Sequence, residues 1–422
     1  MTSNTANVLV GEGWRDSIEA LVRDRIRGLI EEILEEELCE ALGRERYARG
    51  TTESAVDISQ RLGEEVRASA APVRGHRNGR RERNVMGTFG KVTIAVPRAR
   101  LEREDGTTIE WKSKTLPAYR RRTKEVEALI AGSYLSGTNT RRVERALASV
   151  FGRGGVSKDT VSRAWRKIKT DWEAWNKRDL RSEDIARLIL DGTVVRVRLD
   201  RKSTAISLLV VLGVRRDGQK VLLAVRNMGG ESEAAWRALL DDLIARGLRK
   251  PEMAIVDGAQ GLENALINLW SDLLIQRCTV HKLRNLTAHA PKRLAEEIKA
   301  DFNDMVYAAT ATAVAARRKA FLRKWRLKCR AVADSLEEAG DLLFTFTRLP
   351  PSQWKSARTT NAIERLHEEF KRRIKTQTLL PSAETAAMLF WGLLASGQIT
   401  LRKVDGWRTL DRQLAQPIDL AA

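Results

Sequence analysis

Two aspartates suggest chemistry, because each follows an apolar stretch and precedes a glycine. Asp191 stands in LILDGT, at the head of the first strand of a predicted sheet, and Asp257 stands in AIVDGA, at the end of the fourth. Burying a lone carboxylate is unfavourable, so an aspartate after core-like residues needs an explanation. A turn before glycine explains one such residue. Two of them, on strands expected to be neighbours, favour a pair of converging carboxylates.

A third carboxylate is expected from a helix over residues 359–374, which reads TTNAIERLHEEFKRRI. Its predicted buried face consists of Ile363, Leu366, Phe370 and Ile374. Glu364 lies at the border of that face, whereas Glu368 and Glu369 are expected to be more exposed. Because a solvated face is the alternative for each of these acids, helical position alone favours Glu364 only slightly.

Three such carboxylates can hold two divalent cations about 3.5–4 Å apart. One ion would activate a water or a 3′-hydroxyl as the nucleophile, and the other would stabilise the leaving oxygen. Hard oxygen ligands and a phosphate substrate favour Mg²⁺ or Mn²⁺ over zinc. Such a group would support metal-dependent phosphodiester chemistry, with Asp191 and Asp257 as two of the metal ligands and Glu364 slightly favoured over Glu368 and Glu369 as the third.

The elements that must position these acids follow from the pattern of apolar runs and turn signals. β-type runs are predicted over 186–199, 203–218 and 219–230, short strands over 251–257 and 273–280, and helices over 231–247 and 262–270. The order β-β-β-α-β-α-β predicts an α/β fold with a ribonuclease-H-like mixed sheet. Helix-rich sequence after residue 281 predicts that an all-α insertion interrupts this sheet domain.

The chain divides into six predicted regions. They are an N-terminal helical region at 1–70, a small basic β-containing region at 71–124, a helix-turn-helix-like DNA-binding region at 125–180, the first part of the catalytic core at 181–280, an α-helical insertion at 281–355 and the C-terminal helices of the core at 356–422. In the first region, residues 16–43 are predicted to form one helix. Its apolar stripe consists of Ile18, Val22, Ile26, Leu29 and Ile33. We favour packing of this stripe on a core, with dimerisation as the alternative.

Charge indicates a nucleic-acid partner. The 422 residues include 75 Lys and Arg against 55 Asp and Glu, a net charge of +20, and such a surplus favours a polyanion because bound phosphates release counterions. Residues 141–175 read as helix, glycine turn and a helix opening with SKDTVSR, which is typical of helix-turn-helix readers, although a plain helical hairpin is the alternative. The residues predicted to bind DNA are Arg77, Arg81, Arg83, Arg141, Arg142, Ser157, Lys158, Thr160, Ser162 and Arg163.

Other classes of protein fit the sequence poorly. Three scattered cysteines are too few for a disulfide framework and indicate a reducing cytosol. No signal peptide is evident at the N-terminus, and the longest apolar run, AISLLVVLGV, is too short to span a bilayer. We therefore expect a cytoplasmic protein without a membrane partner.

Several motifs in their order resemble the mutator-type transposases of bacterial insertion sequences over nearly the whole chain. They are RNGRRER with GKVTIAVPR, SKDTVSR, LDGTVVRVR, VDGAQGLENAL, QRCTVHKLRN and RTTNAIERLHEEFKRRIK. The resemblance implies a DDE transposase with Asp191, Asp257 and Glu364 as its triad, and a helical insertion before the glutamate. Arg80 departs from the family, which often has an aromatic residue at that place.

The resemblance also implies partners and a reaction. The protein would bind the terminal inverted repeats of its element, cleave DNA at each end and join the freed 3′-hydroxyl to target DNA, as a homodimer or larger assembly at the bacterial nucleoid. Two alternatives stay open from the residues alone. One is a sequence-specific DNA-binding regulator without catalysis, and the other is a hydrolytic nuclease of the same fold.

QRCTVHKLRN also carries the Cys-x-x-His signature of the family, here Cys278 and His281. A structural zinc ion needs four ligands, and the sequence holds no second Cys-x-x-Cys or His-x-x-His pair. We therefore expect Cys278 to end a strand near Asp257, and His281 to act at the catalytic centre against a carboxylate or a substrate phosphate. A core cysteine followed by a helix-capping histidine is the alternative.

Overall fold

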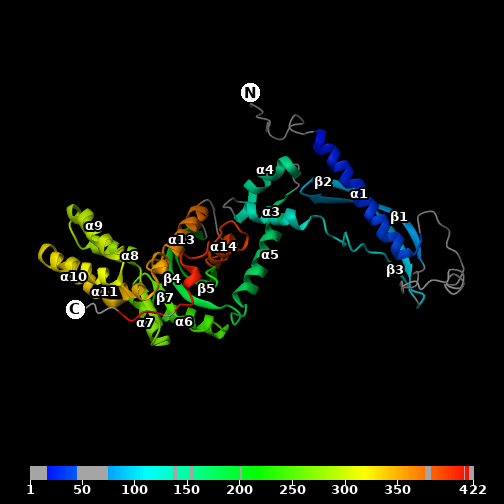
Figure 1. Ribbon diagram of the computed structural model, residues 1–422. Coiled ribbons are helices and arrows are strands. Elements are labelled where there is room, and N and C mark those ends of the chain that lie inside the picture. The colour runs from blue at the N-terminus through cyan, green and yellow to red at the C-terminus, as the bar shows by residue number, and fades with distance from the viewer. Residues whose placement is uncertain are drawn as a thin grey trace, which may run out of the picture. The chain divides into compact units, whose positions relative to one another are not determined.

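The computed structural model describes residues 17–44, 75–103, 105–135, 140–151, 156–199, 202–375, 382–412 and 414–417 (Figure 1). The chain forms two compact units, one of Met1–Tyr134 with Thr140–Trp165 and the other of Leu135–Asn139 with Arg166–Ala422. Asp16, the first residue of the helix predicted over 16–43, lies outside the described residues.

The first unit holds a three-stranded antiparallel sheet in the order β1-β2-β3. Its strands are β1 (Gly75–Gly87), β2 (Gly90–Glu102) and β3 (Thr108–Glu110). Gly90 has a φ of +97°, which suits glycine, and it closes the β1–β2 hairpin at the sequence GTFG. The strand β1 starts well before that turn, so the basic residues that precede it belong to the sheet.

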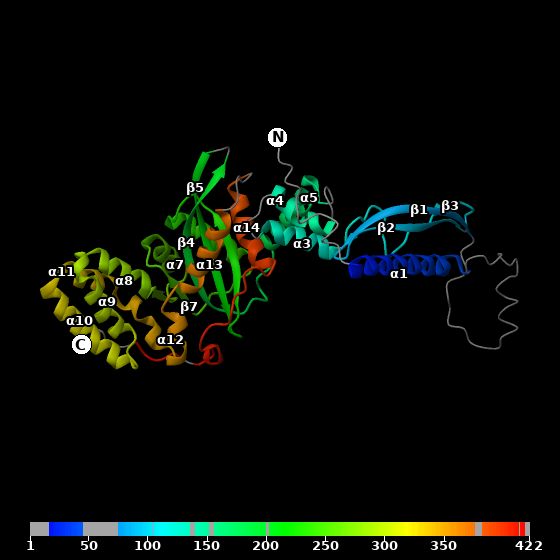
Figure 2. The same ribbon diagram turned by 90° about the horizontal axis from the view of Figure 1, so that it is seen from above.

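A long helix, α1 (Ser17–Leu42), packs along this sheet (Figures 1 and 2). Its buried residues are Leu34, Leu38 and Leu42, and Gly43, with a φ of +63°, ends the helix as predicted. The core-facing interpretation of the predicted stripe is wrong, because Ile18, Val22 and Leu29 are 66%, 46% and 57% exposed. The helix carries two apolar faces, and the one nearer its C-terminus covers β2.

Three helices complete the first unit or begin in it. They are α3 (Lys124–Leu135), α4 (Thr140–Phe151) and α5 (Lys158–Asn176). Their shared core includes Val126, Ile130, Val143, Leu147 and Val161. The Ser157 hydroxyl accepts the Thr160 N–H at 3.3 Å, so Ser157 caps the start of α5.

The second unit contains a five-stranded sheet in the order β6-β5-β4-β7-β8. The strands are β4 (Ile185–Leu199), β5 (Lys202–Arg215), β6 (Lys220–Asn227), β7 (Met253–Val256) and β8 (Leu274–Arg277). β4, β5 and β6 pair antiparallel, whereas β4, β7 and β8 pair parallel. This confirms the predicted mixed α/β architecture and the neighbouring positions of the first and fourth strands of the core.

Helices cover the sheet and extend from it. They are α6 (Glu233–Ala245), α7 (Gln260–Leu269), α8 (Thr279–Ala288), α9 (Ala295–Val306), α10 (Ala311–Lys328), α11 (Arg330–Ala339), α12 (Pro351–Ala357), α13 (Asn361–Ile374) and α14 (Glu384–Ala395), with short 3-10 turns at Lys292–Leu294, Gly340–Leu343, Thr345–Arg348 and Trp407–Thr409. Residues such as Leu188 and Leu190 share a core with α6 and α7. Because side chains alternate along a strand, Asp191 points to the opposite face, where α13 contacts β4.

None of the helices in the described ranges combines the length and the apolar character that a membrane span requires.

Candidate active site and nucleic-acid interface

Asp191 lies in the interior of β4, because that strand continues to Leu199 as a hairpin with β5. The predicted position at the head of the strand is therefore corrected. The parallel pairing with β7 ends at Ile189 and Ile255. Two further steps in that register bring Asp191 level with Asp257, so both carboxylates stand where β7 ends. The Asp191 side chain is buried there.

Asp257 directly follows β7, as predicted for the end of the fourth strand. Its Oδ1 accepts the Ala259 N–H at 2.9 Å, and Gly258, with a φ of +99°, turns the chain toward α7. Burial raises the pKa of Asp257, and the nearby negative charge of Asp191 raises it further, while the Ala259 N–H and His281 oppose the shift. The two aspartates therefore lie close enough to repel one another.

A further carboxylate, Glu231, joins this pair, and the sequence analysis did not identify it. It follows β6 and immediately precedes Ser232, the N-cap residue of α6. Burial raises the pKa of Glu231, as do the charges of Asp257 and Asp191. A methyl group on Gly192 would collide with the Glu231 carboxylate, so the glycine of the LILDGT motif makes room for it. The only sequence signal was an acid placed after two glycines at the end of a strand.

The helix α13 presents its acidic border to the same region. Ile363, Leu366, Phe370 and Ile374 are buried and Glu364 is half-buried, as the sequence predicted. One turn after Glu364, the buried His367 places its Nδ1 3.2 Å from Asp191 Oδ2. Side chains three apart on a helix are neighbours, with Cβ atoms about 5–6 Å apart. Glu364 therefore lies one helical turn before His367, the residue that contacts Asp191 directly.

His367 is the second site residue that sequence reasoning missed. Its Nε2 is buried and has no hydrogen-bond partner among the described residues. The ring contacts Phe390 edge-on, with centroids 5.9 Å apart. The available signal was its spacing of three from Glu364, but only the packing of α13 on β4 reveals what the ring contacts.

Glu364 itself is held by three neighbours. Its Oε1 accepts the Thr360 hydroxyl at 2.9 Å and lies 3.7 Å from His281 Nδ1. Its Oε2 lies 3.3 Å from Arg284 Nη2. His281 therefore stands beside a carboxylate, where the sequence analysis placed it.

Cys278 follows β8 directly, and its N–H donates to the Val256 carbonyl at 2.7 Å, next to Asp257. Burial alone would raise the pKa of the Cys278 thiol, but hydrogen bonds with His281 and Thr360 outweigh it and lower that pKa. The hydrogen bond with Cys278 raises the pKa of His281 to about 9 against the effect of burial.

Two groups of metal-binding side chains therefore lie together. Within the described ranges, the one set of three His, Cys, Asp or Glu residues with all ligand atoms inside 4.8 Å is Cys278, His281 and Glu364. Asp191 and Asp257 interact with each other and with Glu231. This crowding of buried and half-buried carboxylates suits hard divalent cations, whose charge would relieve the repulsion. His367 and His281 join Glu364 to that group.

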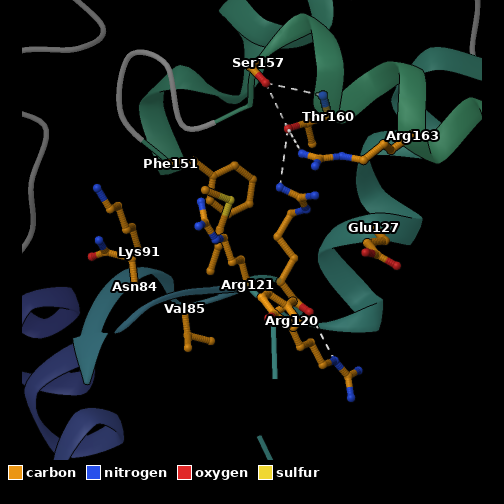
Figure 3. A pocket seen from close by; sticks show the side chains of 13 residues that line it. Asn84, Val85, Lys91, Arg120, Arg121, Glu127, Phe151, Ser157, Thr160 and Arg163 are labelled. Carbon is orange, nitrogen blue, oxygen red and sulfur yellow. Dashed lines mark hydrogen bonds between the residues drawn. The ribbon is translucent and has the colours of Figure 1, made fainter. Parts of the chain in front are cut away.

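The first unit contains a basic pocket of about 670 Å³ (Figure 3). Its lining residues are Asn84, Val85, Met86, Lys91, Tyr119, Arg120, Arg121, Arg122, Glu127, Phe151, Ser157, Thr160 and Arg163. Arg122 Nη1 donates to the Thr160 hydroxyl at 3.4 Å, and its buried Nε has no partner among the described residues. Burial lowers the pKa of Arg122, and the charge of Arg163 lowers it further. An anion would relieve both effects.

The structure gives the predicted DNA-binding residues different settings. Arg77 pairs with Glu35, and Arg83 donates to backbone carbonyls, including Arg120 O at 2.8 Å. Thr160 is buried at the start of α5 and holds the arginines of the pocket. The exposed members of the set are Arg81, Arg141, Arg142, Ser162 and Arg163. Lys158 opens α5, but its side chain lies outside the described part of the chain.

Comparison with known proteins gives one consistent result. Residues 4–398 match the family described as "Transposase, Mutator family". A similar protein is "Transposase for insertion sequence element ISRM5" of Rhizobium meliloti (strain 1021), 28% identical over 368 residues that cover 87% of this chain and 85% of that protein. "Transposase for insertion sequence element IS905" of Lactococcus lactis subsp. lactis (strain IL1403) is 27% identical over 384 residues, 91% of this chain and 90% of that protein. "Transposase for insertion sequence element IS256 in transposon Tn4001" of Staphylococcus aureus is 28% identical over 324 residues, 75% of this chain and 80% of that protein.

Proposed function

Because the chain belongs to the Mutator family of transposases, enzymes that cleave and transfer DNA, we propose that it is a DDE transposase of a bacterial insertion sequence. It binds the terminal inverted repeats of its element, cleaves a phosphodiester at each end and joins the freed 3′-hydroxyl to target DNA. It acts in the cytoplasm, at the nucleoid. The strand order β6-β5-β4-β7-β8 supports a ribonuclease-H-like catalytic domain.

The pairing of Asp191 on β4 with Asp257 at the end of β7 is the observation that carries the proposal. Together with Glu364 they would hold Mg²⁺ or Mn²⁺, because these cations prefer hard oxygen donors and would relieve the repulsion between the carboxylates. The bound ions would activate the attacking oxygen and stabilise the leaving oxygen in an in-line displacement.

The surrounding residues prepare these carboxylates. His367 holds Asp191 Oδ2 at 3.2 Å, which orients the carboxylate from the side of α13. The Ala259 N–H does the same for Asp257 at 2.9 Å. Glu231 adds negative charge and is available as a further oxygen donor or as an acceptor for the proton of the attacking water. Such support fixes the direction of each oxygen before the substrate arrives.

Replacement of one aspartate tests this function. Asp191→Asn should abolish cleavage and strand transfer while binding to terminal-repeat DNA persists. Asp272→Asn, at an exposed carboxylate outside the site, should leave both unchanged. Full activity of Asp191→Asn would reject the assigned role. A wild-type protein that binds DNA without cutting it would instead be a regulator, and one that cuts without joining would be a hydrolytic nuclease.

The pocket of the first unit supports the proposed DNA contact. Arg120, Arg121, Arg122 and Arg163 surround it with Glu127 as the only carboxylate among its lining residues. A backbone phosphate would accept several charge-assisted hydrogen bonds there. The start of α5 lies at the pocket, so a phosphate held in it would bring DNA to Ser162 and Arg163, which are exposed on that helix.

The outer face of α1 supports a homodimer. Ile18, Val22, Leu29 and Ile33 are exposed along one side of the helix. The exposed charges on the same side are Arg25 toward its start and Glu32, Glu36 and Glu40 toward its end. A second copy packed antiparallel would set the basic part of each helix against the acidic part of the other while the apolar side chains are buried together. A transposase must pair two DNA ends, which such a dimer would serve.

A further inference from the structure

The N-termini of α8 and α13 lie close together and bring together three side chains with metal-binding atoms. Cys278 is the N-cap residue of α8, and His281 lies in the first turn of that helix. Glu364 lies in the first turn of α13. The Thr279 N–H and hydroxyl both donate to the Arg358 carbonyl, at 2.9 and 3.1 Å. These bonds tie the start of α8 to the segment before α13.

We propose that Cys278, His281 and Glu364 form a site for a thiophilic divalent cation, best matched by Zn²⁺, which inhibits the enzyme by holding Glu364. The three ligand atoms all lie within 4.8 Å of one another, and His281 Nδ1 is 3.7 Å from Glu364 Oε1. Tetrahedral zinc bonds of about 2.0–2.3 Å set ligand atoms about 3.4–3.6 Å apart. A contraction of at most about 1.4 Å would therefore complete the coordination.

The donor set selects the metal. A thiolate, an imidazole and a carboxylate are the ligand types that zinc takes, and three protein ligands with one open position is a known arrangement for zinc. Mg²⁺ prefers oxygen ligands in octahedral geometry and would not be drawn to a cysteine. The positive ends of α8 and α13 also favour the anionic forms of Cys278 and Glu364.

A buried threonine already orients all three ligands. The Thr360 N–H donates to Cys278 Sγ at 3.4 Å, and the Thr360 hydroxyl donates to Glu364 Oε1 at 2.9 Å. The same hydroxyl lies 3.4 Å from His281 Nδ1. Arg284 contacts the other oxygen of Glu364, so Oε1 is the oxygen that faces the cysteine and the histidine. Such outer contacts typically change metal affinity 10- to 100-fold when they are removed.

The inhibitory role rests on the proposed function, whereas the binding site itself does not. If Glu364 is a ligand of the catalytic ions with Asp191 and Asp257, then a cation that binds it to Cys278 and His281 removes it from that centre. The two uses of Glu364 exclude one another. Zinc should therefore lower DNA cleavage even when Mg²⁺ is abundant.

Cobalt substitution tests the site directly on the full-length, metal-free protein. Titration with Co²⁺ should give one equivalent of tetrahedral visible bands with a sulfur-to-cobalt charge-transfer band, and Zn²⁺ should displace them. Cys278→Ser should lose the charge-transfer band, whereas Cys329→Ser, at a cysteine elsewhere in the chain, should keep it. Absence of the band in the wild-type protein, or its persistence in Cys278→Ser, would overturn the site.

A second variant keeps the test decisive if Cys278→Ser fails to fold, which circular dichroism would reveal. Glu364→Gln keeps the thiol, so the charge-transfer band should remain while Zn²⁺ affinity, measured by competition with a chromophoric chelator, falls at least about tenfold. Thr360→Val should lower the affinity by about 10- to 100-fold. Unchanged affinity in Glu364→Gln would overturn the assignment of that ligand.

Inhibition is measured separately as the fraction of Mg²⁺-dependent cleavage that stoichiometric Zn²⁺ removes and a chelator restores. This fraction should be large in the wild-type protein. In an active Cys278→Ser variant, the Zn²⁺ concentration that gives the same inhibition should be at least about tenfold higher. Zinc binding without inhibition would overturn the regulatory role. If the protein never cleaves DNA but binds Co²⁺ as described, the proposed function fails while the metal site stands.

Discussion

Replacement of Arg122 by glutamine separates phosphate contact from base reading in the pocket of the first unit. Arg122 sits among Arg120, Arg121 and Arg163, and its buried Nε has no partner among the described residues. If this guanidinium holds one phosphate, its removal deletes one charge-assisted contact. Hydrogen bonds to charged groups contribute about 1.5–3 kcal/mol, so affinity should fall about 10- to 150-fold.

The salt dependence gives a second magnitude. Each phosphate contact contributes about 0.9 to the slope of log affinity against log salt concentration. Between about 50 and 200 mM salt, one contact therefore accounts for about a 3.5-fold loss of affinity. The ratio of wild-type to Arg122→Gln affinity should shrink by that factor across this range.

Fluorescence-anisotropy titrations of full-length protein measure both quantities. Terminal-repeat DNA and a scrambled duplex should lose affinity equally in Arg122→Gln, because a phosphate contact carries no base information. Lys112→Gln, at an exposed basic residue outside the pocket, should change neither affinity nor slope by a comparable amount. An unchanged salt slope, or a loss confined to terminal-repeat DNA, would refute the phosphate assignment.

Three further predictions concern the carboxylate group and the proposed dimer. Burial and neighbouring charges raise the pKa of Glu231, so its ionised form destabilises the folded protein, and this penalty is relieved as pH falls through the raised pKa toward the ordinary value. Glu231→Gln should therefore raise the melting temperature of metal-free protein at pH 7 and reduce its gain on acidification; a lower melting temperature at pH 7 would contradict this. His367→Ala should lower the rate of cleavage at saturating DNA with little change in DNA affinity, because it orients Asp191 and does not touch DNA; equal losses in both would contradict it. Leu29→Asp should weaken self-association by about 5- to 150-fold, because a buried polar group costs about 1–3 kcal/mol. Analytical ultracentrifugation measures this effect, and Leu327→Asp, at a leucine 89% exposed on α10, should not show it. An unchanged dissociation constant in Leu29→Asp would exclude this interface.

Local patterns predicted the scaffold of the site well. Apolar runs with turn signals indicated the strands of the core, and their order made the first and fourth neighbours, as the pairing of β4 with β7 shows. The helical period also identified the buried face of α13 and the half-buried position of Glu364. These features depend on residues close in sequence, so they can be read from it.

Features that depend on tertiary packing were missed or misjudged. Glu231 reaches the carboxylate pair only because the segment between β6 and α6 packs against Gly192 of β4. His367 reaches Asp191 only because α13 lies on β4. The apolar stripe of α1 predicted a buried face at Ile18 and Leu29, although both are exposed. Periodicity identifies an apolar face but cannot say whether this chain or another one covers it.

The pairing of Asp191 with Asp257 as a site for divalent cations is tested most directly by Mn²⁺ binding. Electron paramagnetic resonance measures the free Mn²⁺ that remains after mixing with the full-length protein and terminal-repeat DNA. The Asp191→Asn/Asp257→Asn variant should stay folded, because the substitutions remove charges that repel one another. We expect the wild-type protein and Asp272→Asn to bind Mn²⁺ and the double variant not to bind it. Equal Mn²⁺ binding by the double variant and the wild-type protein would contradict it.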